Sequence, residues 1–423
     1  MNKLELVQKA IELEWPVRLL NPLIGKFNPF LPEFRHSPYP FYQRLRQQAP
    51  VYYSRGLQGW ILTRHRDIVG VLADARFSVE RQHSDMFKKV NFLAALTPDL
   101  TDVLLHTLLM LDPPNHTRLR KLVSKAFTPR RVEQLRPRIE NIVADLLDRL
   151  DGAAEIELVR DFAIPLPVIV IAEMLGVPAT DRERLKAWSD TLAVLVDPMQ
   201  ATGGLAPIEK AFSELRDYLH QIIAARRVAP RDDLISALVA AEEAGDTLTE
   251  VELLSLVVLL LAAGNETTTN LIGNGVLALL AHPEQRRRFC EEPELARNAV
   301  EELLRYDSPV QLTDRMAKED LEICGHRIRK GQLVASLLGA ANRDPQQFAD
   351  PDRLDLGRSD NAHLSFGHGV HFCLGSQLAR LEAQVALPAL LRRFPKLSRR
   401  ESRIDWKRSI VLRGPLALRL ATS

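Results

Sequence analysis

The stretch from Phe366 to Gly375 reads FGHGVHFCLG and places one cysteine among three glycines, directly before a helical stretch. Glycine allows positive φ angles and a close approach of the backbone to a neighbouring group. A cysteine at a helix N-terminus has its thiolate favoured by the helix dipole and by free amide groups. Such a thiolate, shielded by Phe366, suits an axial haem ligand. A lone cysteine is more often an inert buried residue, but the glycine pattern favours the functional interpretation.

The composition of the 423-residue chain is that of a globular protein. Charged residues make up 26% and hydrophobic residues 46%, and the formal net charge is +2. These values argue against disorder and fibrous repeats and do not indicate nucleic-acid binding. Three cysteines predict no disulfide scaffold and fit a reducing, cytoplasmic compartment. We expect neither a secretory signal nor a transmembrane segment, because the longest apolar run, Leu253–Ala263, has about half of the roughly 20 residues required.

Apolar periodicity predicts a mainly α chain with β structure in small sheets. Pro50–Ser54 and Trp60–Arg64 are predicted to form a hairpin, and Leu321–Ile328 and Leu333–Leu338 are predicted to flank a turn at Lys330-Gly331. Helical spacing is found in Phe41–Gln48, Asp67–Ala73, Ile139–Leu150, Pro167–Leu175, Asp181–Leu195 and Ile208–Arg226.

A long central helix is the clearest expected element. Thr249 and Glu252 match a capping box, an apolar run follows, and Pro283 ends the segment. A helix that is apolar on nearly all sides belongs in the centre of a large core. The polar residues at positions 264–267 are therefore unusual, because buried polar groups need hydrogen-bond partners or a function.

The cysteine segment, read as Phe-Gly-x-Gly-x-His-x-Cys-x-Gly, resembles the haem-binding loop of the cytochrome P450 family. The resemblance implies the P450 fold, an α+β fold with a long helix over a buried haem b. It implies Cys373 as the iron ligand, with Phe366, Gly367, His371 and Gly375 around the cofactor. We expect an N-terminal arm over residues 1–34 and a single P450 domain over residues 35–423.

Three further residues resemble the buried structural triad of this family. Glu302 and Arg305 stand three apart on one helix face, and Arg353 follows in an FADPDR segment. An isolated pair of this kind would be a weak surface contact. Within the resemblance, the two arginines would neutralise a buried Glu302 and fix the loop that carries Cys373.

His116 and Arg120 lie four apart on a predicted helix that follows a Pro-Pro pair. Histidine and arginine are suitable donors to carboxylates. The resemblance implies that both bind a haem propionate, and that Arg315 and His371 make the other propionate contacts. The alternative is a solvated basic helix face.

The segment from Ala263 to Thr268 resembles the oxygen-activating part of the family's central helix. Ala263 and Gly264 are small enough to let the helix pass close over a flat cofactor. The Thr267 hydroxyl and the Glu266 carboxylate would then deliver protons during oxygen activation. The alternative is a solvated helix kink in which Thr267 bonds back to a carbonyl.

An apolar pocket and a hydrophobic small-molecule substrate are expected beside the haem. The candidate lining residues, for which ordinary core packing is the alternative, are Val258, Leu259, Ala262, Val310, Leu312 and Val411.

The sequence has no glycine-rich dinucleotide fingerprint and no cluster of four cysteines. Electrons are therefore expected from a separate ferredoxin or flavodoxin with an NAD(P)H-dependent reductase. A patch of basic residues consists of Arg118, Lys121, Lys125, Arg130 and Arg131. Its two interpretations are a docking site for this electron donor and a helix face that only keeps the protein soluble.

The resemblance implies a monomeric, soluble, bacterial-type haem-thiolate monooxygenase that uses O2. Fatty acids, polyketides, terpenoids and similar compounds of secondary metabolism are the implied substrates, and hydroxylation or epoxidation is the implied reaction. The two alternatives are a peroxide-driven peroxygenase and a non-catalytic haem sensor. The Glu266–Thr267 pair argues against both.

Overall fold

The computed structural model describes residues 27–55, 57–90, 96–192, 205–243 and 248–423. The longer helices are α5 (Tyr39–Gln48), α6 (His65–Ala73), α9 (Asn115–Ser124), α11 (Arg136–Asp148), α12 (Pro165–Met174), α13 (Arg182–Leu192), α14 (Ala206–Val228), α15 (Leu234–Glu243), α16 (Glu250–Ala281), α17 (Pro283–Glu291), α18 (Ala296–Tyr306) and α20 (Ser376–Arg393). The shorter helices are α4 (Pro32–His36), α7 (Asp85–Val90), α8 (Pro98–Leu105), α10 (Pro129–Gln134) and α19 (Leu338–Ala341).

The strands form three small sheets. The largest has the order β1-β2-β8-β5-β3 and consists of β1 (Val51–Ser54), β2 (Gly59–Leu62), β8 (Leu333–Leu337), β5 (Leu312–Ala317) and β3 (Phe77–Ser78). Its β2–β8 pair is parallel, and the other pairs are antiparallel. The second sheet is formed by β4 (Glu155–Glu157), β10 (Arg419–Ala421) and β9 (Ser398–Arg399), and the third by β6 (Leu321–Ile323) and β7 (His326–Ile328).

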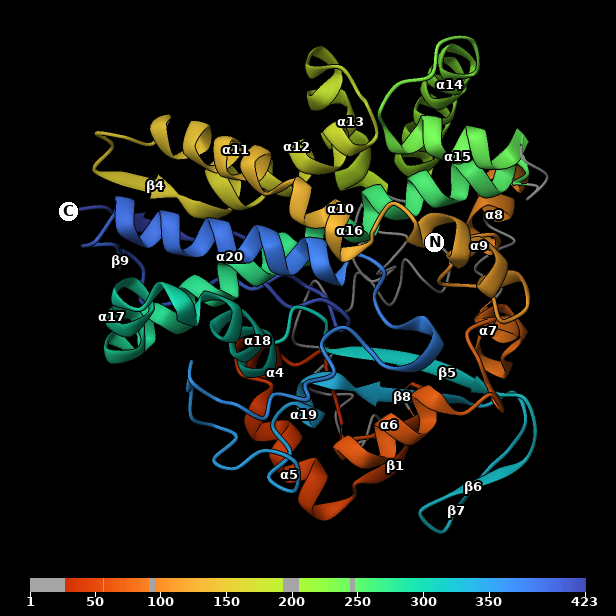
Figure 1. The fold of residues 1–423 in the computed structure, drawn as a ribbon. Helices are drawn as coiled ribbons and strands as arrows, with labels where there is room; N and C mark the ends of the chain where they lie inside the picture. The colour runs from red at the N-terminus through yellow and green to blue at the C-terminus, as the bar shows by residue number, and fades with distance from the viewer. Residues whose placement is uncertain (1–26, 56, 91–95, 193–204, 244–247) are drawn as a thin grey trace.

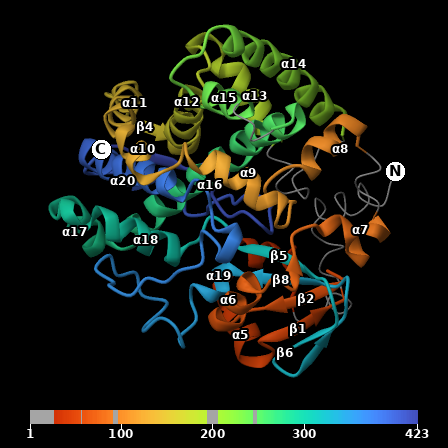
Figure 2. The ribbon, with the colours of Figure 1, turned by 45° about the vertical axis from the view of Figure 1, so that its right-hand side comes forward.

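Helices and sheet occupy different parts of the molecule. In Figure 1, the helices from α10 to α16 and α20 lie above the five-stranded sheet, with α5, α6 and α19 near its strands. Figure 2 shows the same division, with α9 and α16 between the upper helices and the sheet. The loop that contains Cys373 leads into α20, and its turn at residues 369–371 contacts α6, so the loop lies where the two parts meet.

The predicted central helix is confirmed as α16, which runs unbroken for 32 residues. Both halves of the capping box are formed, because Glu252 N–H donates to Thr249 Oγ1 and Thr249 N–H donates to the Glu252 carboxylate. Side chains of α12, α13, α18 and α20 surround it. By length and composition α16 could cross a membrane, but 61% of its most apolar window is buried in the protein. That burial is expected of a core helix.

Two expectations about local structure need correction. Leu321–Ile328 is not one strand, because Cys324 and Gly325 adopt positive φ angles of 50° and 79° and turn the chain between β6 and β7. The strand that follows, β8, pairs with β5 instead. The helix expected over Pro167–Leu175 begins two residues earlier, with Pro165 rather than Pro167 at the first position of α12. The hairpin of β1 and β2 is confirmed, with Tyr52 opposite Ile61.

The expected division at residue 34 falls inside α4, and residues 1–26 of the expected arm lie outside the described part of the chain. Phe34 is buried in a cluster that includes Tyr42 of α5 and Leu337 of β8. The chain from α4 onward is therefore packed against the five-stranded sheet.

Candidate active site

The loop that carries Cys373 is closed by its own backbone. Gly367 N–H donates to the Leu364 carbonyl and Cys373 N–H donates to the Phe366 carbonyl, both at 2.8 Å. Because α20 begins three residues later, the thiol lies next to the helix N-terminus and accepts a hydrogen bond from Gly375 N–H. The Cys373 side chain is exposed. Loss of hydration among the surrounding protein atoms nevertheless raises the pKa of its thiol, and the Gly375 amide, Arg120 and Arg380 oppose that rise.

Two glycines of the loop are required by its conformation. Gly367 and Gly369 have φ angles of +74° and +72°, which other residues rarely adopt. At Gly369 a Cβ atom would lie 2.5 Å from the backbone oxygen of Leu72 in α6. At Gly375 a Cβ atom would meet nothing within 4 Å in the described chain. The loop therefore needs Gly369 in order to pack directly against α6.

Phe366, at the start of the cysteine loop, contacts α20. The Arg380 guanidinium is 4.5 Å from the centre of the Phe366 ring. Arg380 also forms two hydrogen bonds to Glu301 of α18, at 2.6 and 2.8 Å, and His363 contacts the same carboxylate at 3.1 Å. These partners hold the pKa of Glu301 at about 2, against the opposing effect of burial. A charged network thus fixes the base of the loop.

On the other side of the loop, α9 contributes two basic residues. The rings of His116 and His371 lie 4.1 Å apart. Both ring nitrogens of His116 are buried and lack a hydrogen-bond partner among the described residues. Arg120, one turn further along α9, donates to the Phe372 carbonyl at 2.5 Å. The predicted pair His116 and Arg120 therefore meets the loop that contains His371.

A third element, β5, brings in Arg315. This side chain is buried and donates to Thr313 Oγ1 at 3.3 Å and to the Asp314 carbonyl at 2.8 Å. The Asp314 carboxylate is bound by Arg81 at 2.5 Å. Within the described part of the chain, Arg315 forms no salt bridge of its own.

The basic groups at this junction repel one another. Burial, together with the positive charge of Arg81, lowers the pKa of Arg315 to about 10, although Asp314 and Asp112 oppose this shift. Burial also lowers the pKa of His371 to about 3, helped by the positive charges of His116, Arg315 and Arg120. Buried charge of one sign is costly unless an opposite charge compensates it. Asp112 and Asp314 offset part of this positive charge. Within the described residues, however, the His116 ring nitrogens have no hydrogen-bond partner and Arg315 has no salt bridge, so the cluster would stabilise an acidic ligand.

The middle of α16 carries the remaining predicted residues. Thr267 Oγ1 donates to the Ala263 carbonyl at 2.9 Å, which is the back-bonded geometry considered as the alternative for this threonine. The Glu266 carboxylate is 3.1 Å from Lys407 Nζ. Gly264 faces α12, where a Cβ atom would make ordinary contact with Ile171 at 3.9 Å.

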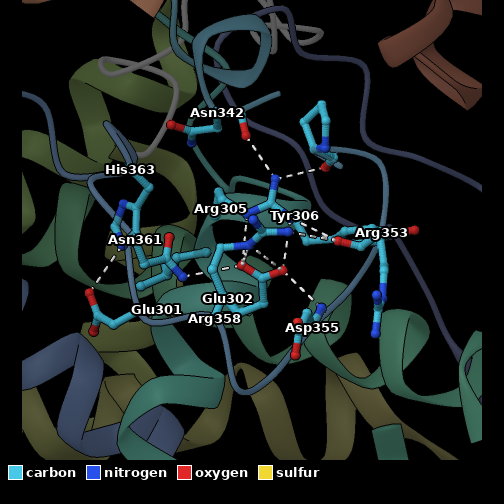
Figure 3. Close-up of polar contacts among 12 residues, drawn as sticks. Glu301, Glu302, Arg305, Tyr306, Asn342, Arg353, Asp355, Arg358, Asn361 and His363 are labelled. Carbon is cyan, nitrogen blue, oxygen red and sulfur yellow. Dashed lines mark hydrogen bonds and ion pairs between the residues drawn. The ribbon is translucent and has the colours of Figure 1, made fainter. Parts of the chain in front are cut away.

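The predicted triad around Glu302 is wrong in one member. Glu302 and Arg305 are fully buried and joined by hydrogen bonds of 2.7 and 2.8 Å. The second arginine is Arg358, whose Nε lies 3.1 Å from Glu302 Oε2 (Figure 3). Arg353 is exposed and supplies only its backbone carbonyl, which accepts from Arg305 at 3.1 Å. The loop turns between these residues, so only Arg358 reaches the carboxylate.

Comparison with known proteins identifies the family. The family model for cytochrome P450 matches residues 83–416. The chain belongs to the cytochrome P450 family. Cytochrome P450 107B1 of Saccharopolyspora erythraea is 44% identical over 409 residues, which cover 93% of this chain and 96% of that protein. The polyketide biosynthesis cytochrome P450 PksS of Bacillus subtilis is 40% identical, with coverage of 94% and 98%.

A solved structure agrees with this assignment. P450BioI in complex with hexadec-9Z-enoic acid ligated acyl carrier protein has a TM-score of 0.85 and 43% identity, and the match covers 92% of this chain and 99% of that one. The fold is thus the P450 fold, and the chain is a bacterial-type P450 monooxygenase.

Cytochrome P450 proteins bind haem b, an iron porphyrin with two propionates. The residues of this chain fit that group. Cys373 offers a thiol at a helix N-terminus, which is a known axial ligand of haem iron. Within the described residues, the buried nitrogens of His116 have no hydrogen-bond partner and the buried Arg315 forms no salt bridge, and two propionates would supply these contacts.

The predicted lining residues divide into two groups. Val258 and Ala262 are buried inside the protein, and Val258 packs within the main helical core, which favours ordinary packing. Leu259 is only partly buried and lies four residues before Ala263, on the same helix face. Val310, Leu312 and Val411 are also partly buried. Gln311 N–H donates to the Val411 carbonyl at 2.7 Å, so these three come together.

Several residues of the site had no signal in the sequence. Arg358 follows Arg353 by five positions in an irregular loop, where no periodicity distinguishes the two. Arg81 and Lys407 lie in segments without a recognisable motif, and Lys407 is followed directly by a second basic residue, Arg408. Glu382 lies in α20, where it is buried and accepts a hydrogen bond from Thr268. Its position amid the apolar residues of a helix was the one available signal, because buried carboxyl groups are rare.

Proposed function

We propose that this P450 is a haem-thiolate monooxygenase that inserts one oxygen atom of O2 into a hydrophobic small molecule. The balanced hydroxylation converts R–H, O2, two electrons and two protons into R–OH and water. When bound, haem b supplies the iron at which O2 is activated, and the thiolate ligand favours O–O cleavage. The proposal rests chiefly on the basic cluster of His116, Arg120, Arg315 and His371 beside the Cys373 loop, in which the buried His116 ring nitrogens have no hydrogen-bond partner among the described residues.

Each proposed residue has one task. Cys373 binds the iron, and Phe366, Gly367 and Gly375 shape the loop around that bond. The basic cluster binds the two propionates. Ala263 leaves space for the cofactor beside α16, whereas the Cβ position of Gly264 points towards Ile171 of α12, so a cofactor contact of Gly264 would involve its backbone. The Thr267 hydroxyl and the Glu266 carboxylate hold and deliver protons.

The substrate is proposed to be a fatty acid, a polyketide or a similar natural product. Support comes from PksS, which is named for polyketide biosynthesis, and from P450BioI, which was solved with a fatty acid on acyl carrier protein. Val310, Leu312, Val411 and Leu259 would contact its apolar part. A library of such compounds, free and attached to acyl carrier protein, can be screened by the low-spin to high-spin shift of the haem spectrum.

Electrons would come from a ferredoxin or flavodoxin and an NAD(P)H-dependent reductase, with the P450 as a cytoplasmic monomer. Within the proposed basic patch, Arg118 is paired with Glu252, and Lys121, Lys125, Arg130 and Arg131 are exposed. Exposed Val370 and Phe372 lie in the cysteine loop itself. An acidic partner with a small apolar centre fits these features.

The decisive experiment compares Cys373→Ala and Thr267→Ala with the unchanged protein. Cys373→Ala should lose the ferrous–CO band of a thiolate-bound haem. Thr267→Ala should keep that band but form less product per NAD(P)H and release more peroxide. A retained band in the first variant, or unchanged coupling in the second, contradicts the proposed roles. Faster turnover with peroxide than with ferredoxin and NADPH would favour a peroxygenase.

A further inference from the structure

A hairpin near the C-terminus, residues 405–416, lies beside the middle of α16. Leu416 N–H donates to the Asp405 carbonyl at 2.7 Å, and Lys407 N–H donates to the Gly414 carbonyl at 3.1 Å. Trp406 and Pro415 form an isolated antiparallel bridge. These contacts fix the position of Lys407 on the first arm of the hairpin.

The second arm of the hairpin is hydrogen-bonded to residues 309–312, which we call the substrate segment because Val310 and Leu312 are proposed to contact the substrate. Arg413 N–H donates to the Pro309 carbonyl at 2.8 Å, and the Val411 carbonyl accepts from Gln311 N–H at 2.7 Å. Val310 and Leu412 form an antiparallel bridge. A molecule that contacts Val411 therefore touches the hairpin that carries Lys407, and one that contacts Val310 touches a residue bridged directly to it.

The first arm is attached to α16 through an ion pair. Lys407 Nζ lies 3.1 Å from Glu266 Oε1, and only 14% and 10% of the two side chains are exposed. Further along α16, Gly273 approaches the hairpin so closely that a Cβ atom would lie 2.8 Å from Pro415. Loss of one partner from a largely buried pair leaves an uncompensated charge, so the contact constrains where the Glu266 carboxylate can be.

We propose that Lys407 is a positioning residue that holds the Glu266 carboxylate against the hairpin and ties proton delivery to the substrate segment. This inference rests on the proposed role of Glu266 as a proton carrier. Successive side chains of a helix are about 100° apart, and Thr267 faces the Ala263 carbonyl on α16. Lys407 therefore keeps the Glu266 carboxylate largely shielded from solvent, on the residue next to Thr267 in α16.

The test uses the full-length holoenzyme with its electron donor and a substrate found by the spectral screen. Lys407→Met should lower product formed per NAD(P)H about tenfold, with KM unchanged, because misplaced catalytic groups are costly. Lys407→Arg keeps the charge and should retain most of the coupling. Lys396→Met, at an exposed lysine after α20, is the matched control and should have no effect. An unchanged ferrous–CO spectrum confirms that each variant is folded.

A second measurement does not depend on turnover. In the substrate-free protein, hydrogen exchange over residues 405–416 should rise in Lys407→Met and in Glu266→Gln, but not in Lys396→Met. Equal exchange in all variants would overturn the proposal, because the ion pair would then not hold the hairpin.

Combination of the two substitutions separates this proposal from the proposed function. If Lys407 acts through Glu266, adding Lys407→Met to Glu266→Gln should cause no further loss of coupling. A further tenfold loss would overturn the inference. If Glu266→Gln loses coupling while Lys407→Met keeps full coupling, the positioning role of Lys407 is refuted and the proton-delivery role of Glu266 is retained. Full coupling in Glu266→Gln would instead refute the relay itself.

Discussion

At the scale of single residues, the choice between Arg353 and Arg358 has a measurable consequence. Arg358 donates to the buried Glu302 carboxylate, whereas the exposed Arg353 contributes only its backbone. Hydrogen bonds to charged groups contribute about 1.5–3 kcal/mol. Arg358→Met should therefore lower the free energy of unfolding by about that amount, and Arg353→Met by less than about 0.5 kcal/mol. Equal effects in denaturant unfolding would contradict this assignment.

A second residue-scale prediction concerns Glu382. Burial raises the pKa of this carboxyl group to about 8, and the hydrogen bond from Thr268 opposes the rise only in part. The folded protein then retains a proton that the unfolded chain releases above its ordinary pKa of 4.5. The contribution of this group to stability is therefore full below pH 4.5 and is lost as the pH rises to about 8, by about 1.4 kcal/mol per pH unit.

Glu382→Gln should remove this slope, because the amide does not ionise. The variant should match the unchanged protein near pH 5 and exceed its free energy of unfolding at pH 8. Glu301→Gln is the opposite case, because the pKa of Glu301 is held at about 2. Its carboxylate contributes stability at pH 7 that is lost as the pH falls from 4.5 towards 2. The check is denaturant unfolding, from pH 5 to pH 8 for Glu382→Gln and from pH 7 down towards pH 2 for Glu301→Gln.

At the scale of elements, the contact between the cysteine loop and α6 can be tested with two glycines. Gly369→Ala would combine a positive φ angle with a Cβ atom 2.5 Å from the Leu72 carbonyl. Gly70 lies inside the same helix α6, and a Cβ atom there meets nothing within 4 Å. Gly369→Ala should lower the melting temperature and haem content. Gly70→Ala should stabilise by about 0.5–1 kcal/mol. Similar haem content in both variants would rule out this contact as a constraint.

Elements were predictable from sequence where the local pattern determines them. The capping box at Thr249 and the apolar run after it lead directly to α16. The hairpin of β1 and β2 follows from two short strand-like segments with glycines between them. The turn within Leu321–Ile328 does not follow from the sequence alone, because Cys324 adopts a positive φ angle that sequence rules expect of glycine. Lys407 could not be predicted, because its contact with Glu266 spans 141 positions and depends on how the hairpin packs.

At the scale of the whole molecule, haem is expected to join the helical and β-rich parts. His116 and Arg120 come from α9, Arg315 from β5, and Cys373 and His371 from the loop between the sheet and α20. Without an acidic group, the buried Arg315 charge opposes folding. A ligand that binds only the folded state stabilises it further. Removal of haem should therefore lower the melting temperature of the entire protein, and calorimetry of the apoprotein measures that loss.

Arg315→Met tests this account, because it should act in opposite directions on the two forms. In the apoprotein, removal of a buried, unpaired charge should leave the melting temperature equal or higher. In the holoenzyme, loss of a propionate partner should lower it and speed the transfer of haem to an acceptor protein. The difference in melting temperature between apoprotein and holoenzyme should therefore become smaller in Arg315→Met. It should stay unchanged in Arg353→Met. An equal decrease in both forms would mean that Arg315 is simply part of the packing of β5, and that its burial does not reflect cofactor binding.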